Sequence, residues 1–91
     1  DLLPIAFGLD PNYPNPFDLV TTVTYTLPEA VHVRLTIFDA FGRLIATLAE
    51  EHQPAGRYRV NFMADALASG VYIYSLEAGA FKIRRTMLLV R

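Results

Sequence analysis

Apolar and polar residues alternate along much of this chain, and this alternation limits it to folds built from β-strands. The segments 20–27 and 31–38 show the pattern best, with mostly apolar residues at one set of alternate positions and mostly polar residues at the other. Because successive side chains on a strand point to opposite faces, each segment predicts a strand with one buried face. The residues expected to face the core are Thr21, Val23, Tyr25 and Leu27; Val31, Val33, Leu35 and Ile37; Leu44, Ala46 and Leu48; Tyr58, Val60 and Phe62; Tyr72, Tyr74 and Leu76; and Phe81 and Ile83.

Turn residues separate these segments. The run Asp39–Gly42 predicts a type I turn with Gly42 in the left-handed region, and therefore a tight hairpin. The returning segment 43–50 also fits a short helix by propensity, but the hairpin before it favours a strand. A longer connection is expected over 51–56, and a loop over 64–70. Strands spaced by roughly ten residues, without a convincing helix, predict an all-β fold: an immunoglobulin-like antiparallel β-sandwich of about seven strands.

Prolines at positions 11, 14 and 16 give the segment 10–18 a distinct character. Proline has no amide donor and biases the residue before it towards extended conformations, so this segment predicts a stiff strap rather than a helix or a central strand. We expect Tyr13 and Phe17 to anchor the strap to the core, and Ile5 and Phe7 to belong to a short lead-in strand. Residues 1–19 are thus expected to pack on a β-sandwich formed by residues 20–91, all in a single domain.

The segment Gly70–Arg91 predicts a closing hairpin with its turn at residues 77–80. Ser75 and Glu77 suit its solvent face. The run Met87–Val90 is apolar, so it is expected to be buried in a sheet or held by a partner. Arg85 interrupts the alternation of the last strand. A bulge near Arg84–Arg85 would reset which side chains point inward, so that either Leu88 and Val90 or Met87 and Leu89 complete the core.

Composition argues against several classes of protein. Hydrophobic residues make up 53% of the chain, too many for a disordered segment. No apolar run approaches the ~18 residues that span a bilayer. The first residues lack the pattern of a signal peptide, so we expect a module of a longer protein. There is no cysteine, and neither His32 nor His52 is followed by a carboxylate at zinc-ligand spacing. We therefore expect no enzyme, no metal site and no cofactor.

Basic residues gather near the end of the chain, at Lys82, Arg84, Arg85 and Arg91, and Arg57 and Arg59 would widen this cluster if they lay on a neighbouring strand. Two interpretations stay open. The cations form a solvated strand face that discourages stray strand pairing, or they form a docking surface for an acidic partner or anionic lipopolysaccharide. Nucleic acid is not expected, because the net charge is −1.

Several motifs occur in order along the chain: Asn12–Phe17, Ile37–Arg43, Pro54–Gly56, Leu67–Tyr72 and Lys82–Arg91. Taken together, they resemble one family: the type A C-terminal sorting domain of proteins exported by the type IX secretion system of Bacteroidota and their relatives. The chain departs from that pattern at Asp18-Leu19, where the family often has Asn-Pro, and at Phe62, where tryptophan is common. The related immunoglobulin-like domain of flagellar hook-capping proteins shares much of the pattern.

The resemblance implies a non-catalytic signal that directs a larger cargo protein across the outer membrane to the cell surface. The implied partners are the N-terminal cargo domain of the same chain, the type IX translocon, a sortase-like outer-membrane protease and possibly anionic lipopolysaccharide. The implied location is the periplasm in transit, then the outer membrane, the cell surface or the medium. The residues expected to take part in partner recognition are Gly70, Val71, Tyr72, Lys82, Arg84, Arg85, Met87, Leu88, Leu89, Val90 and Arg91.

Two other functions compete with this expectation. A passive immunoglobulin-like spacer or carbohydrate-binding module would, in its binding form, expose a row of aromatic residues, for which Tyr72 and Tyr74 are the only candidate pair. A hook-cap-type assembly module would self-associate.

Overall fold

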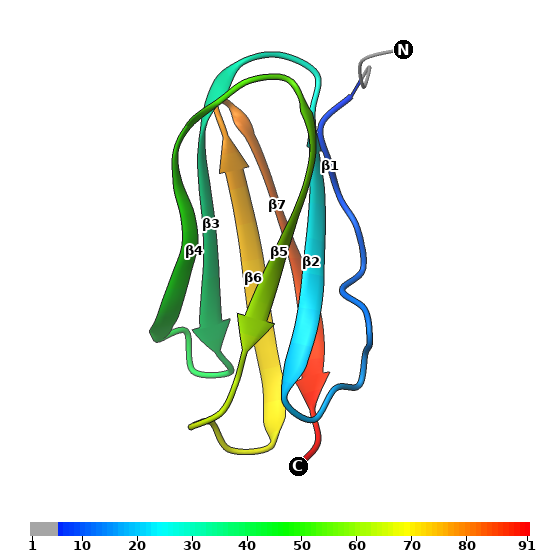
Figure 1. The fold of residues 1–91 in the computed structure, drawn as a ribbon. Helices are drawn as coiled ribbons and strands as arrows, with labels where there is room; N and C mark the ends of the chain where they lie inside the picture. The colour runs from blue at the N-terminus through cyan, green and yellow to red at the C-terminus, as the bar shows by residue number, and fades with distance from the viewer. Residues whose placement is uncertain (1–5) are drawn as a thin grey trace.

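The structure, a computed structural model, describes residues 6–91 and contains seven strands in two antiparallel sheets. The sheets have the orders β1-β2-β5 and β4-β3-β6-β7, and they face each other as the two layers of a sandwich (Figure 1). The predicted all-β immunoglobulin-like sandwich of seven strands is therefore confirmed. The strands are β1 (Gly8–Leu9), β2 (Val20–Leu27), β3 (Val31–Asp39), β4 (Leu44–Gln53), β5 (Gly56–Met63), β6 (Gly70–Ala78) and β7 (Phe81–Leu89).

The core lies between the sheets and is built from alternate residues, as the sequence predicts for β2, β3 and β6. Each fully buried aliphatic side chain contributes about 1.5–3 kcal/mol to folding relative to an exposed one. A slip of one residue in any of these strands would exchange its buried face for its solvent face. The fully buried apolar residues of these strands are Val23, Tyr25, Leu27, Val33, Leu35, Ile37, Tyr74, Leu76 and Ala78.

The hairpin between β3 and β4 forms at the predicted turn, where the amide of Gly42 donates to the main-chain oxygen of Asp39 at 3.0 Å and Gly42 has a φ of 84°. The segment after it is a strand, but its register shifts twice against β3. As a result Leu44 is 52% exposed, and Ile45 packs against the core instead. The expectation of an inward Leu44 was wrong, because two bulges change which side chains face the core.

Two further expectations about exposure and length were wrong. Ser75 lies opposite Thr36 on the outer face of the four-stranded sheet, yet both small side chains are buried. β4 also continues to Gln53 and β5 begins at Gly56, so the connection expected over 51–56 is only two residues long. The loop expected between β5 and β6 is present, without a helix.

The proline-rich strap, residues 10–18, runs from β1 to β2 and lies along one side of the sandwich (Figure 1). Its Tyr13–Pro14 and Asn15–Pro16 peptide bonds are cis. Phe17 is buried as predicted, but Tyr13 is 80% exposed and Asn12 is buried in its place. The lead-in strand contains Gly8 and Leu9 rather than Phe7, while Ile5 lies outside the described residues.

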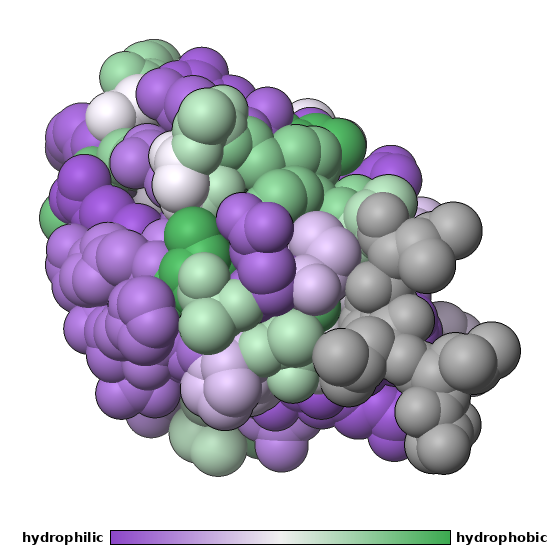
Figure 2. Space-filling view, turned by 90° about the horizontal axis from the view of Figure 1, so that it is seen from above, coloured by the Kyte–Doolittle hydropathy of each residue, from purple (hydrophilic) through white to green (hydrophobic). Residues whose placement is uncertain are grey.

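The two ends of the sandwich carry different connections. One end holds the β2–β3, β4–β5 and β6–β7 turns, and Figure 2 views it from above, with hydrophobic residues near its centre and hydrophilic residues mainly along one side. The other end holds the Asp39–Arg43 turn, the loop between β5 and β6, and the C-terminus (Figure 1). No helix among residues 6–91 has the length and apolar character to cross a bilayer.

Candidate recognition surface

The terminal strand β7 forms one edge of the four-stranded sheet and pairs with β6 from Phe81 to Leu89 without a shift in register. Met87 and Leu89 are fully buried and complete the core, while Leu88 points outward. The expectation of burial in a sheet is confirmed for Met87 and Leu89, which the structure selects from the two alternatives, whereas Leu88 and Val90 are exposed.

The bulge expected at Arg84–Arg85 was wrong, because Arg85 keeps its place in the ladder opposite Tyr74. This position belongs to the inward face of β7. Arg85 is nevertheless exposed, because its guanidinium lies at the open side of the sandwich. There its Nε donates a hydrogen bond to the main-chain oxygen of Leu9. A long side chain can thus occupy an inward position at a sheet edge, with its apolar stem against the core and its charged group outside.

The strap closes one end of the β7 edge. The amide of Phe17 donates to the main-chain oxygen of Leu88 at 3.0 Å, and the amide of Val90 donates to the oxygen of Phe17 at 2.9 Å. The side-chain oxygen of Asn15 accepts a hydrogen bond from the amide of Leu88 at 2.9 Å. An edge strand offers unpaired main-chain groups to other strands, and the strap covers these groups at the Leu88 end of β7.

Arg91 folds back onto the loop before β6. Its guanidinium donates to the main-chain oxygens of Ala64, Leu67 and Asp65, the latter two at 3.3 Å. Its amide donates to the hydroxyl of Ser69 at 2.9 Å. These contacts hold the last residue against the body of the domain.

The Gly70–Tyr72 motif begins β6, directly beside the end of β7. Gly70 pairs with Leu89 and has a φ of 152°, in a region that glycine adopts far more readily than residues with a Cβ. Tyr72 is buried, and its hydroxyl donates to the main-chain oxygen of Ala68 at 2.7 Å. Val71 points outward opposite Leu88 and is half exposed. The motif therefore combines two structural residues with one surface residue.

The basic residues do not form one cluster. Lys82 and Arg84 lie on the outer face of β7, where Lys82 is 3.7 Å from the carboxylate of Glu77. Arg57 and Arg59 belong to β5 in the other sheet. Arg91 lies at the opposite end of β7 from Lys82. The expectation that β5 would widen the basic surface was wrong, because the strand order is set by contacts distant in the sequence.

Two motifs shared with the sorting domains contain structural polar residues that the sequence analysis did not single out. The amide group of Asn12 donates to the hydroxyl of Thr21 at 2.9 Å, and that hydroxyl donates to the main-chain oxygen of Pro14 at 2.8 Å. These bonds fasten the strap to β2. The alternation does place Thr21 in the core, but it gives no sign that Asn12 is its partner.

The second motif is the Asp39 turn. The Asp39 carboxylate accepts hydrogen bonds from the amides of Arg43 and Phe41, each at 2.9 Å, and from the Arg43 guanidinium at 2.7 Å. The amide of Arg43, reinforced by its side chain and by the amide of Phe41, lowers the pKa of Asp39 below its ordinary value. The carboxylate thus stabilises the turn that separates β3 from β4.

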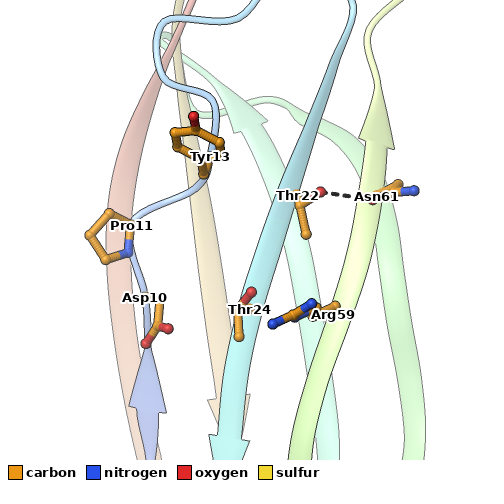
Figure 3. A pocket seen from close by; sticks show the side chains of 7 residues that line it. All are labelled: Asp10, Pro11, Tyr13, Thr22, Thr24, Arg59 and Asn61. Carbon is orange, nitrogen blue, oxygen red and sulfur yellow. Dashed lines mark hydrogen bonds between the residues drawn. The ribbon is translucent and has the colours of Figure 1, made fainter.

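A shallow polar groove of about 570 Å³ lies on the outer face of the three-stranded sheet. The strap forms one wall, β2 supplies Thr22 and Thr24, and β5 supplies Arg59 and Asn61 (Figure 3). Thr22 donates to the amide oxygen of Asn61 at 2.9 Å. The other lining residues are Asp10, Pro11 and Tyr13. The carboxylate of Asp10 in this groove accepts a hydrogen bond from the Arg57 guanidinium at 2.9 Å.

No group of three or more His, Asp or Glu side chains within residues 6–91 is arranged to hold a metal ion. Tyr72 and Tyr74, the candidate aromatic pair for a carbohydrate site, are both buried. The features that stand out are the ordered terminal strand and the outward side chains around it. Comparison with known proteins agrees, because the family described as "Secretion system C-terminal sorting domain" matches residues 12–90.

The chain belongs to this family of sorting domains. It is a C-terminal sorting signal for type IX secretion. Such a signal belongs to a larger cargo protein and directs that protein to the outer membrane or the cell surface. The match does not favour the spacer, carbohydrate-binding or hook-cap functions. No curated protein and no solved structure matches the chain.

Proposed function

We propose that the type IX translocon recognises this sorting domain through the outward side chains of its closing hairpin. The observation that supports the proposal is the ordered end of β7, which is paired with β6 on one side and with the strap on the other. A terminus held in this way presents its exposed residues in one geometry, so a receptor would not have to order a flexible tail on binding.

The expected recognition residues fall into two groups by their burial. Tyr72, Met87 and Leu89 are buried, so we infer that they act by holding the hairpin in place. The residues with exposed side chains would contact the receptor directly: Val71, Lys82, Arg84, Leu88 and Val90. Gly70, Arg85 and Arg91 would act mainly through the backbone and side-chain bonds that fix the hairpin.

After export, a sortase-like outer-membrane protease would remove the domain, and the cargo would stay at the surface on anionic lipopolysaccharide. The domain would pass through the periplasm in its folded state. The chain has no cysteine, and its sandwich is built around one continuous hydrophobic core, which suits a module that must fold before it is recognised.

An export assay tests the proposal. The domain is fused to a periplasmic reporter in a host with type IX secretion, and the reporter is measured in the periplasm and at the surface. We expect deletion of Met87–Arg91 to abolish export. Substitution of Leu88 by Lys should reduce export without unfolding the domain, because Leu88 points outward. Thr24→Lys on the other sheet is the matched control. Undiminished export of the deletion would refute the proposal.

A further inference from the structure

An apolar band crosses the outer face of the four-stranded sheet near the end that carries the C-terminus. Its first row consists of Leu44, Phe38 and Ile73, which are direct cross-strand neighbours on β4, β3 and β6. Its second row consists of Val71 and Leu88, which are paired on β6 and β7. We call these five residues the outer band.

The outer band exposes apolar surface where an antiparallel sandwich ordinarily presents polar residues. Leu44, Val71 and Leu88 are 52%, 47% and 39% exposed, and Phe38 and Ile73 are half-buried between them. The band is therefore continuous across four strands rather than a scatter of single residues. Contiguous apolar patches of this kind mark surfaces that another molecule covers.

The outer band is bordered by Arg84 and by Arg43, and the Arg43 guanidinium pairs with the Asp39 carboxylate at 2.7 Å beside Val71. Arg84 lies beside Phe38 and Ile73, where these residues and Gly42 line a small hollow of about 110 Å³. Within residues 6–91, Arg84 has no ion-pair partner. Glu77, on the neighbouring strand β6, pairs with Lys82 at 3.7 Å instead. A partner that covers the band and carries acidic groups at its rim would pair with Arg84.

The band also lies far from the side where the chain enters the fold. Phe7 stacks on Phe81 at the start of β7, with ring centroids 5.0 Å apart, whereas Leu88 lies near the end of the same strand. Seven residues of strand separate two such positions by roughly 23 Å. The described part of the chain therefore enters the fold at the opposite end of the sandwich from the outer band (Figure 1).

We propose that the outer band is the docking surface for an outer-membrane receptor protein whose complementary surface is apolar with an acidic rim. The inference rests on the proposed function and extends the recognition surface from the closing hairpin to β3 and β4. Val71 and Leu88 join the two parts, since they belong to both the closing hairpin and the outer band. The added contacts are those of Phe38, Leu44 and Ile73, none of which the sequence analysis assigned to recognition.

The test uses the full exported fusion with substitutions outside the closing hairpin. Leu44→Glu places a negative charge in the band at an exposed position of an edge strand, where folding tolerates it. We expect export to fall about tenfold, the effect of losing one well-packed contact of an interface. Met63→Glu is the matched control, because Met63 is 59% exposed on the other sheet. Thermal denaturation of both purified fusions should give the wild-type midpoint.

The outcomes separate this inference from the proposed function. If Leu44→Glu is exported at the wild-type level while deletion of Met87–Arg91 abolishes export, the outer band is not a docking surface and the proposed function stands. If the deletion is exported and Leu44→Glu is not, the proposed function is refuted, and recognition rests on the part of the outer band outside residues 87–91.

Two further measurements address other occupants of the band. In the first, the purified fusion is mixed with phosphatidylglycerol–phosphatidylethanolamine vesicles. If the wild-type fusion binds them and Leu44→Glu abolishes the binding, the outer band docks on a lipid surface and the proposal is overturned. In the second, sedimentation measures the oligomeric state. If the wild-type fusion is a dimer and Leu44→Glu is a monomer, the outer band binds a second copy of the chain, and the proposal is overturned. A monomer that does not bind these vesicles supports a receptor protein.

Discussion

The amide of Phe17 donates a hydrogen bond to the main-chain oxygen of Leu88 at 3.0 Å, which joins the proline-rich strap to the terminal strand. The two segments lie near opposite ends of the sequence. The family match covers both of them, and the structure gives a physical reason why they occur together. The strap holds the end of β7 in place, and Phe17 secures the strap by packing edge-on against Phe62 with 6.3 Å between ring centroids.

Replacing Phe17 by Ala tests this arrangement. The side chain is 3% exposed, and removing a buried phenyl ring costs about 3–5 kcal/mol of unfolding free energy. We expect a loss of this size in urea denaturation. Tyr13→Ala in the same strap is the control, and it should change stability by less than about 0.5 kcal/mol because Tyr13 is largely exposed. Equal effects of the two substitutions would contradict the role assigned to Phe17.

Because of Asp39, we expect the unfolding free energy of the domain to change with pH in the acidic range. The pKa of Asp39 in the folded state is lower than its ordinary value of 3.8. Its contribution to stability is therefore fully present above the ordinary pKa and is lost as the pH falls through the lower, folded pKa. We expect Asp39→Asn to be less stable than wild type at neutral pH, with a difference that shrinks towards low pH.

Urea denaturation across the acidic range measures the effect of Asp39→Asn. Asp65→Asn provides the control, because Asp65 is exposed and its carboxylate accepts no hydrogen bond within residues 6–91. A difference for Asp39→Asn that stays constant with pH would show that the charge of Asp39 does not stabilise the turn.

Tyr25 and Tyr74 predict a loss of stability at alkaline pH. Burial raises the pKa of both phenols above the ordinary value of 10.0. Each contribution is fully present below pH 10.0 and is lost as the pH rises through the folded-state pKa. Titration of tyrosinate absorbance should show two groups that ionise last. Tyr25→Phe should reduce the alkaline loss of stability, and an unchanged loss would count against Tyr25 as a source.

A substitution at Gly70 can distinguish a structural role of the Gly70–Tyr72 motif from a role in recognition. Its φ of 152° lies in a region that is nearly restricted to glycine, although a Cβ there would meet no atom within 4 Å. We expect Gly70→Ala to lower the unfolding free energy by about 1–3 kcal/mol through backbone strain alone. Thermal denaturation measures this change. Wild-type stability combined with lost export would instead assign Gly70 a direct contact with the receptor.

Sequence patterns sufficed for the buried faces of β2 and β6. β2 and β6 bury the residues that alternation predicts, because each strand pairs with its neighbours without a bulge. β4 departs from prediction for the opposite reason, since its two register shifts turn Leu44 outward. A bulge depends on how two strands fit together, and the sequence of one strand does not reveal it.

The terminal hairpin was predicted as an element, but the roles of its residues were not. Arg85 looked like a break in the strand, whereas it occupies an inward position because the main-chain oxygen of Leu9 lies within reach. Arg91 looked like a free cation, whereas it bonds to the loop before β6. Both outcomes depend on segments that are distant in the sequence.

The sequence by itself determined the all-β class, the positions of most strands and turns, and the family, because alternation and turn chemistry are properties of a few neighbouring residues. Only the tertiary structure decided the strand order, and with it the placement of Arg57 and Arg59 on the other sheet and the assembly of the outer band from four strands. Strand order follows from which apolar faces pack together across the whole chain. No local pattern contains that information.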